Sequence, residues 1–209
     1  PRQPKPPSKP PLVAVMPGSR DEELAQHLPT LAAAASRMRA DGARFRVVAS
    51  SAERAREIGT RWPAQCGGAS AVVQIPIVDA TADADVAWVA SGTAVLETAL
   101  RGVPQVAFYR IGDAQYRIVE RRLPRIAHGP ITLPNLVCGR QIVPELLQHD
   151  FEPATLVAKT SELLDDGDAR RAQLAGLEDF RRMLGPADAL AQIGEYVLGI
   201  LERTASRAS

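Results

Sequence analysis

Short apolar runs alternate with longer segments of mixed polarity along the first half of the chain. Each run has the length of one strand and is apolar at nearly every position, which is typical of strands covered by helices on both faces of a parallel sheet. The segments between them have a helical pattern, the first of them beginning at a cap that we assign to Ser19. The pattern predicts strands at 12–16, 45–49, 71–75, 85–90 and 105–109, and helices up to about residue 40, at 52–61, around 81 and at 93–101.

The second half of the chain has a helical pattern throughout. It predicts helices at 113–123, 140–148, 153–166, 168–184 and 187–204. Alternation of strands and helices followed by helices alone indicates an α/β domain. We therefore predict a Rossmann-like parallel sheet with helices on both faces, followed by C-terminal helices.

Residues 1–11 are rich in proline and predict a semi-rigid linker. The domain is then expected to cover residues 12–209. The first residue is Pro1 rather than methionine, which suggests a piece cut from a longer protein, with another domain upstream of the linker.

The composition is that of an ordinary globular protein, with 209 residues, 45% apolar and 23% charged side chains. A net charge of +1 and the lack of a basic block with interleaved aromatic residues argue against a nucleic-acid partner. The two cysteines and three histidines are scattered, so we propose no metal site. No apolar run reaches the ~18 to 20 residues of a transmembrane helix.

The motif Ser91-Gly92-Thr93 lies between a predicted strand and a predicted helix. Backbone N–H groups at a helix start attract phosphate, Gly92 allows close approach, and the two hydroxyls can bind the same oxygens. Glu97, one turn further, could reach the hydroxyls of the same ligand, as in a nucleotide sugar. The alternative is that Ser91 only caps an ordinary helix.

A second turn, Gly18-Ser19-Arg20, follows the first predicted strand. Carboxyl ends of parallel strands meet at one edge of a sheet, so this turn and Ser91–Thr93 are expected to share a crevice. Arg20 supplies a planar cation suited to a diphosphate, unless it is only a solvated surface side chain. GxGxxG and GxxxxGK[ST] are both absent, which excludes dinucleotide-binding and P-loop proteins.

A third segment runs from Leu133 to Gln148. Asn135 follows a proline and offers an amide that suits a sugar or a uracil edge, although an asparagine that closes a turn is the alternative. Pro144 and Glu145 are expected to begin a helix that points Glu145 at the same crevice.

Taken together, these motifs resemble the C-terminal half of the lipid-A-disaccharide synthases, inverting glycosyltransferases of the GT-B fold. The resemblance runs from about residue 12 to the end, and Gln141 departs from it where a charged residue is expected. The matching segments are Pro17–Arg20, Ser91–Leu100, Gly102–Pro104, Tyr109-Arg110, Leu133–Leu136 and Val143–Gln148.

The resemblance implies transfer of 2,3-diacylglucosamine from UDP-2,3-diacylglucosamine to 2,3-diacylglucosamine 1-phosphate. The product would be the β-1,6 disaccharide of lipid A, with release of UDP and without cofactor or metal. It also implies a cytoplasmic protein in peripheral contact with the inner membrane, and it leaves room for a homodimer.

In such enzymes this half binds the UDP part of the donor, and the general base lies in the N-terminal acceptor half, which is absent here. We therefore assign no catalytic residue and expect the chain to bind but not to catalyse. Two alternatives stay open, another UDP-sugar enzyme of the GT-B fold, such as an epimerase, and a non-catalytic binding module. The donor-binding candidates are Gly18, Ser19, Arg20, Ser91, Gly92, Thr93, Glu97, Asn135 and Glu145.

Overall fold

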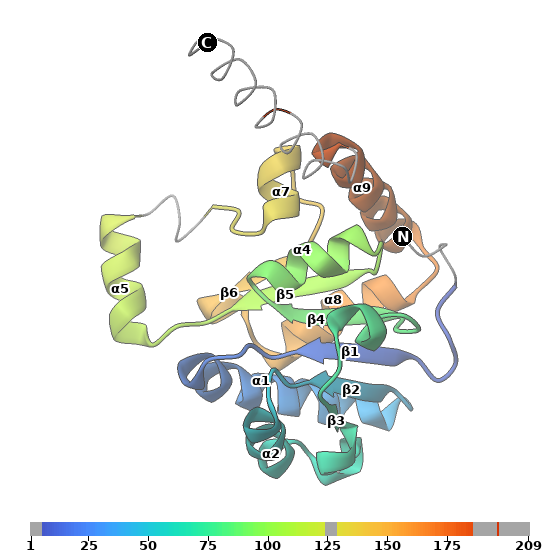
Figure 1. Ribbon diagram of the computed structural model, residues 1–209, viewed down its shortest axis with the longest axis vertical. Helices are drawn as coiled ribbons and strands as arrows, with labels where there is room; N and C mark the ends of the chain where they lie inside the picture. Colours follow the sequence, from blue (N-terminus) through green and yellow to red (C-terminus); the bar gives the residue numbers. More distant parts are fainter. Residues whose placement is uncertain (1–5, 124–128, 186–195, 197–209) are drawn as a thin grey trace, which may run out of the picture.

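Six parallel strands form one sheet in the computed structural model, which describes residues 6–123, 129–185 and 196 (Figure 1). The strand order is β3-β2-β1-β4-β5-β6, so the order reverses at β1. In register, Val15 of β1 lies beside Val47 of β2 and Trp88 of β4. The strands are β1 (Leu12–Met16), β2 (Arg44–Val48), β3 (Val72–Val73), β4 (Val86–Ala90), β5 (Gln105–Tyr109) and β6 (Glu145–Leu147).

The helices cover both faces of the sheet, as the apolar strands predict. One face carries α1, α2 and α8, and the other carries α3, α4, α7 and α9. The bounds are α1 (Asp21–Ala40), α2 (Ala52–Arg61), α3 (Ile77–Ala80), α4 (Thr93–Leu100), α5 (Asp113–Arg122), α7 (Leu133–Cys138), α8 (Pro153–Leu164) and α9 (Asp168–Leu184), with 3-10 turns η1 (Ala64–Cys66), η2 (Gly68–Ala71) and η3 (Gln148–Asp150).

Alternate residues of the central strands enter two separate apolar cores. In β1, Val13 and Val15 pack with α1 and α8, whereas Ala14 and Met16 pack toward α4 and α9. Helix α1 meets the first core with Leu24, Leu28 and Leu31, which the helical period places on one face.

Both tryptophans of the chain, Trp62 and Trp88, are buried in the first core. Phe45 lies against both, with ring centroids 5.9 and 5.6 Å apart. The indole of Trp88 donates a 2.7 Å hydrogen bond to the Thr160 hydroxyl of α8. Because this polar pair is satisfied inside the core, it fixes α8 on the sheet without an unpaired buried donor.

Helix α5 stands apart from the sheet (Figure 1). None of its residues is buried, although Ile118 on it is apolar. The helix thus exists where 113–123 predicts it, but it adds nothing to either core.

The predicted helix at 140–148 is wrong. Residues Glu145–Leu147 form β6, which pairs with the edge of β5, and the Pro144 carbonyl accepts a 2.9 Å hydrogen bond from the Ala107 amide. Proline cannot donate to a helix interior, and Ile142 and Val143 favour extended backbone. A free sheet edge therefore decides the conformation of a segment whose local pattern is ambiguous.

Residues 6–11, the described part of the expected linker, contain neither helix nor strand. They lie along the start of β4, because the buried Asp85 carboxylate accepts hydrogen bonds from the amides of Ser8 (2.9 Å) and Leu12 (2.8 Å). The helix predicted at 187–204 lies outside the described residues, apart from Tyr196.

Candidate functional site

A cavity of about 750 Å³ opens at the carboxyl ends of β1 to β4, where the strand order reverses. Ligands of open parallel sheets bind at this place. Its walls come from the turn after β1 and the connections after β2, β3 and β4. The structure brings together six of the predicted residues here: Gly18, Ser19, Arg20, Ser91, Gly92 and Thr93.

Glu23 occupies the amides at the start of α1 on one wall. Its Oε2 accepts hydrogen bonds from the backbone N–H of Ser19 (2.9 Å) and of Arg20 (3.3 Å). Burial alone would raise the pKa of the Glu23 carboxyl, but these bonds and the Arg20 guanidinium outweigh it and hold the pKa below its usual range. The prediction that Ser19 caps α1 is wrong, since the cap position is Arg20 and the amides are satisfied by Glu23.

Gly18 makes this arrangement possible. Its φ of +111° lies in the region that side chains rarely adopt, and a Cβ there would lie 2.6 Å from Oε2 of Glu23. A residue other than glycine would therefore push the carboxylate away from the amides.

Helix α4 begins at another wall of this cavity, where the Val95 amide donates a 3.2 Å hydrogen bond to the Gly92 carbonyl and the amides of Thr93 and Ala94 have no partner among the described residues. Its N-cap is Gly92, no side chain among the described residues caps it, and its first turn contains no acidic residue. Unsatisfied N–H groups and the positive end of the helix dipole favour an anion there. The first turn of α1 already contains Asp21, Glu22 and Glu23, whereas the first turn of α4 contains no acidic residue, so α4 offers the less negative helix start to this cavity.

The Arg20 side chain borders the same cavity with most of its surface in solvent. It is 77% exposed, and its Nη1 donates a 2.8 Å hydrogen bond to Oε1 of Glu23. An exposed ion pair of this kind contributes about 0 to 1 kcal/mol. The guanidinium can therefore turn toward an anionic ligand at little energetic cost.

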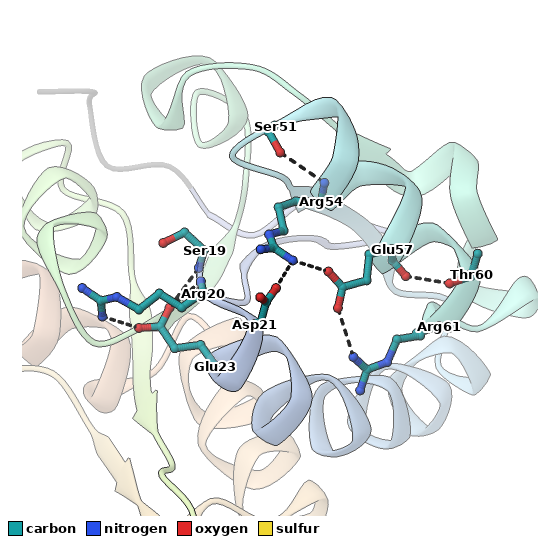
Figure 2. A network of polar contacts seen from close by, with 9 residues as sticks. All are labelled: Ser19, Arg20, Asp21, Glu23, Ser51, Arg54, Glu57, Thr60 and Arg61. Carbon is teal, nitrogen blue, oxygen red and sulfur yellow. Dashed lines mark hydrogen bonds and ion pairs between the residues drawn. The ribbon is translucent and has the colours of Figure 1, made fainter.

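Figure 2 shows that Asp21, the first residue of α1, pairs with Arg54 of α2. Arg54 of α2 pairs with Asp21 and, at 2.6 Å, with Glu57, which also lies 3.5 Å from Arg61. The hydroxyl of Ser51 accepts from the Arg54 amide and caps α2. This network joins α1 and α2, and within it both Asp21 and Glu57 are paired with arginine.

The third wall is mainly apolar. Val48, Ala49, Ile75 and Pro76 line it, and Ile75 and Pro76 are exposed to solvent although they are apolar. The prediction of a strand to residue 75 missed this wall, because β3 ends at Val73 and the next residues border the cavity instead. Pro76 was the available signal, since proline is confined to strand ends and edges.

Glu97 lies in α4 one turn after Thr93, as predicted, and its side chain is exposed. It is not among the residues that line the cavity. It reaches a ligand only if that ligand extends past the helix start along α4.

Asn135 is buried in α7, and its amide is fully used within the chain. The Nδ2 group donates to the Val143 carbonyl (2.8 Å) and to Glu145 (2.6 Å), while Oδ1 accepts from the amides of Ile142 (2.7 Å) and Val143 (2.9 Å). Two donors and two acceptor positions exhaust an asparagine amide. No group remains for a ligand, so Asn135 holds the end of α7 to the segment before β6.

The carboxylate of Glu145 serves the same junction. It accepts hydrogen bonds from the Ile131 amide (2.9 Å) and from the amide (3.0 Å) and hydroxyl (2.6 Å) of Thr132. Asn135 and Glu145 border a separate cavity of about 660 Å³. The prediction that Glu145 points from a helix start into the first cavity is therefore wrong.

Within residues 6–123 and 129–185, no three His, Cys, Asp or Glu side chains gather as a metal site requires. None of the described helices combines the length and apolar character needed to cross a bilayer.

Comparison with known proteins assigns the chain to a family. A family model described as lipid-A-disaccharide synthetase matches residues 3–192. The chain belongs to the lipid-A-disaccharide synthase family. It is 38% identical over 197 residues to the synthase of Anaeromyxobacter dehalogenans (strain 2CP-C), a match that covers 90% of this chain and 49% of that protein. The synthase of Pseudomonas aeruginosa (strain UCBPP-PA14) is 36% identical over 195 residues, which is 92% of this chain and 50% of that protein.

The chain thus spans about half the length of the curated synthases that it matches. Among solved structures, the glycosyltransferase SnogD from Streptomyces nogalater superposes with a TM-score of 0.52 at 20% identity, over 91% of this chain and 45% of SnogD. At that identity the likeness concerns the fold, and it confirms the Rossmann-like prediction.

Proposed function

We propose that the cavity binds the UDP part of a nucleotide-sugar donor, and that this chain is the donor-binding half of a lipid-A-disaccharide synthase. One observation carries the proposal: the open start of α4 and the exposed Arg20 border the same cavity. An uncapped helix start and a guanidinium both bind phosphate groups.

We infer the order of the parts of such a ligand from the residues that line the cavity. The diphosphate would lie against Ser91–Thr93 and Arg20, and one flat face of the uracil base would lie against Ile75 and Pro76. The ribose then falls between them, and Glu97 is the nearest candidate on α4 to accept from its hydroxyls. This arrangement supports a nucleoside diphosphate over a free sugar phosphate, which would leave the apolar wall uncovered.

The reaction that we propose is transfer of 2,3-diacylglucosamine from its UDP derivative to 2,3-diacylglucosamine 1-phosphate, giving the β-1,6 disaccharide of lipid A. Charge develops on the leaving UDP as the glycosidic bond breaks, and Arg20 and the α4 start stabilise that charge. The base that takes the acceptor proton is supplied outside this chain. On the same grounds we infer a cytoplasmic protein that contacts the inner membrane peripherally, and a homodimer is compatible with this role.

Calorimetry on the 209-residue chain tests the proposal with UDP and uridine as ligands. Each charge-assisted hydrogen bond contributes roughly 1.5 to 3 kcal/mol, so UDP should bind at least about tenfold more tightly than uridine. Equal affinities, or no detectable binding of either ligand, contradict it.

A further inference from the structure

His27 is a buried histidine that joins two segments of the site. It lies in the second turn of α1, and its ring is fully buried. Its Nδ1 is 2.8 Å from the carbonyl oxygen of Pro17, and its Nε2 is 3.1 Å from the backbone nitrogen of Arg110. The rings of Phe108 and Phe151 contact it edge-on, with centroids 5.1 and 5.8 Å away.

The two backbone partners determine the protonation of this ring. The Arg110 amide can only donate, so Nε2 must be unprotonated and Nδ1 must carry the proton that it donates to Pro17. A protonated imidazolium would place a second N–H against the Arg110 amide and break that bond. Burial lowers the pKa of His27, although the bond to Pro17 and the nearby Glu23 carboxylate act in the opposite direction. The other ionisable groups that face the ring are the Arg110 guanidinium and the phenol of Tyr109.

The two segments that His27 joins both border a small cavity. Pro17 immediately precedes the Gly18–Arg20 turn, and Arg110 begins the loop after β5. Arg20 and residues 109–112 line a cavity of about 220 Å³ that is separate from the first one. His27 therefore lies beneath both walls of that cavity and spans them.

The loop after β5 is itself held firmly. The Gln148 side chain accepts a 2.7 Å hydrogen bond from the Ile111 amide, and the Arg110 guanidinium donates to the carbonyls of Gln148 (2.9 Å) and Phe151 (2.6 Å). Through His27 the turn that carries Arg20 is attached to this fixed loop. Without the imidazole, the Pro17 carbonyl loses its hydrogen-bonded connection to the loop after β5.

We propose that His27 is a positioning residue for the diphosphate end of the donor, and that its neutral ring holds the Gly18–Arg20 turn at a fixed spacing from the loop after β5. The inference rests on the proposed function, because it assumes that Arg20 meets a diphosphate. It assigns His27 no contact with the ligand.

The first experiment compares wild type with His27→Phe by calorimetry on the 209-residue chain, with UDP and uridine as ligands. Phenylalanine fills the ring space but makes neither hydrogen bond. Indirect coupling of this kind is worth roughly a three- to tenfold loss of UDP affinity, and uridine binding should be unchanged. The matched control is Thr160→Val, which removes a buried hydrogen bond of α8 at a distance from the cavity. It should lower the melting temperature and leave both affinities unchanged.

The second experiment measures the ratio of the UDP dissociation constants of His27→Phe and wild type as a function of pH. Titration of the phosphate affects both proteins and cancels in this ratio. Because burial lowers the pKa of His27, the ratio should be constant at neutral pH and fall toward one only at acidic pH, below 6.5, the ordinary value for histidine, where the wild-type ring becomes protonated. Long-range ¹H–¹⁵N spectra of wild type at neutral pH should show the Nδ1–H tautomer, a readout that needs no variant.

The outcomes separate this inference from the proposed function. If wild type binds UDP and His27→Phe binds it equally well, or if the ring is an Nε2–H tautomer, the positioning role is wrong and the proposed function stands. If wild type binds no UDP, both the proposed function and the positioning role of His27 are wrong. If the variant does not fold, an Nε2–H tautomer in wild type still contradicts the positioning role, and loss of the pH dependence of UDP binding in wild type does so as well.

Discussion

The Arg20 guanidinium donates a 2.8 Å hydrogen bond to the Glu23 carboxylate, whose other oxygen accepts from the amides of Ser19 and Arg20, the two residues before α1. One carboxylate thus both fixes the turn before the helix and holds an arginine beside the cavity. A bound diphosphate competes with Glu23 for the guanidinium but not for the amides. Ligand binding can therefore proceed without opening the start of the helix.

Arg20→Ala should weaken UDP binding about tenfold or more, since it removes at least one charge-assisted hydrogen bond to the diphosphate. Thermal stability should change little, because the side chain is 77% exposed. Calorimetry with UDP and uridine measures the effect, and Arg56→Ala, an exposed arginine of α2 that does not line the cavity, is the control. Unchanged UDP affinity in Arg20→Ala would show that the arginine is only a surface residue.

Gly18→Ala should destabilise the chain by more than about 1 kcal/mol, because its backbone conformation is unfavourable for alanine and the new Cβ meets Oε2 of Glu23. Glu23→Ala should cost about 0.5 to 2 kcal/mol through loss of the cap. Both changes disturb the same contact. In denaturant unfolding, the double variant should therefore lose less unfolding free energy than the sum of the losses of the two single variants. Strictly additive losses of unfolding free energy would contradict the proposed contact between position 18 and Glu23.

Glu23 also predicts a dependence of stability on pH. Its pKa is lowered in the folded chain, so its contribution is present above the ordinary pKa of a glutamate and is lost as the pH falls through the folded value. Unfolding free energies measured between neutral and acidic pH should therefore fall less steeply in Glu23→Ala than in wild type. Parallel curves would show that the carboxylate is not stabilised by the amides.

Glu97→Gln should reduce UDP affinity and leave the melting temperature unchanged, because the exposed carboxylate would accept from ribose hydroxyls and supports no core contact. A titration and a melting curve on the same sample measure the two effects. Glu162→Gln, on the exposed face of α8, is the matched control. A variant that unfolds would instead assign Glu97 a structural role.

Asn135→Ala should destabilise the chain by roughly 3 kcal/mol or more, because it leaves buried amides of residues 142 and 143 without acceptors. The UDP affinity of the folded fraction should stay that of wild type. Gln141→Ala, an exposed neighbour, should change neither quantity. Loss of UDP affinity without loss of stability would restore Asn135 to the binding site.

The 209-residue chain should form no disaccharide when both acylated sugars are supplied in detergent. An in-line acceptor hydroxyl and a base are required, and the chain spans about half the length of its curated relatives. Product should appear only when the remaining half of such an enzyme is added. Product above the level of an Arg20→Ala control from this chain alone would contradict the division of roles.

The central strands were predictable because burial on both faces demands apolar residues at every position. Val13 to Met16 show this directly, with successive side chains entering two different cores. Residues 145–147 were not predictable, because their conformation depends on the edge of β5, which the local pattern does not reveal. Short apolar segments can form either element, and the tertiary partner decides.

The candidate site, like the fold, could be predicted only in part. Arg20 and Ser91–Thr93 could be placed in one cavity, since topology alone brings the carboxyl ends of β1 and β4 together. Asn135 and Glu145 could not be separated from ligand-binding residues, because a polar side chain that organises backbone looks identical in sequence to one that binds a sugar. His27 gave one local signal, its position between Leu24 and Leu28 on the buried face of α1.

The burial of Trp62 and Trp88 in the first core has a practical consequence for these measurements. Neither indole lines the cavity, so intrinsic fluorescence should report the unfolding of the layer formed by α1, α2 and α8 and remain silent toward bound nucleotide. Unfolding curves can then be recorded with ligand present, without correction for quenching by the bound nucleotide. The displacement of their midpoints gives the dissociation constant by mass action, which makes the optical signal an affinity assay that needs no labelled ligand.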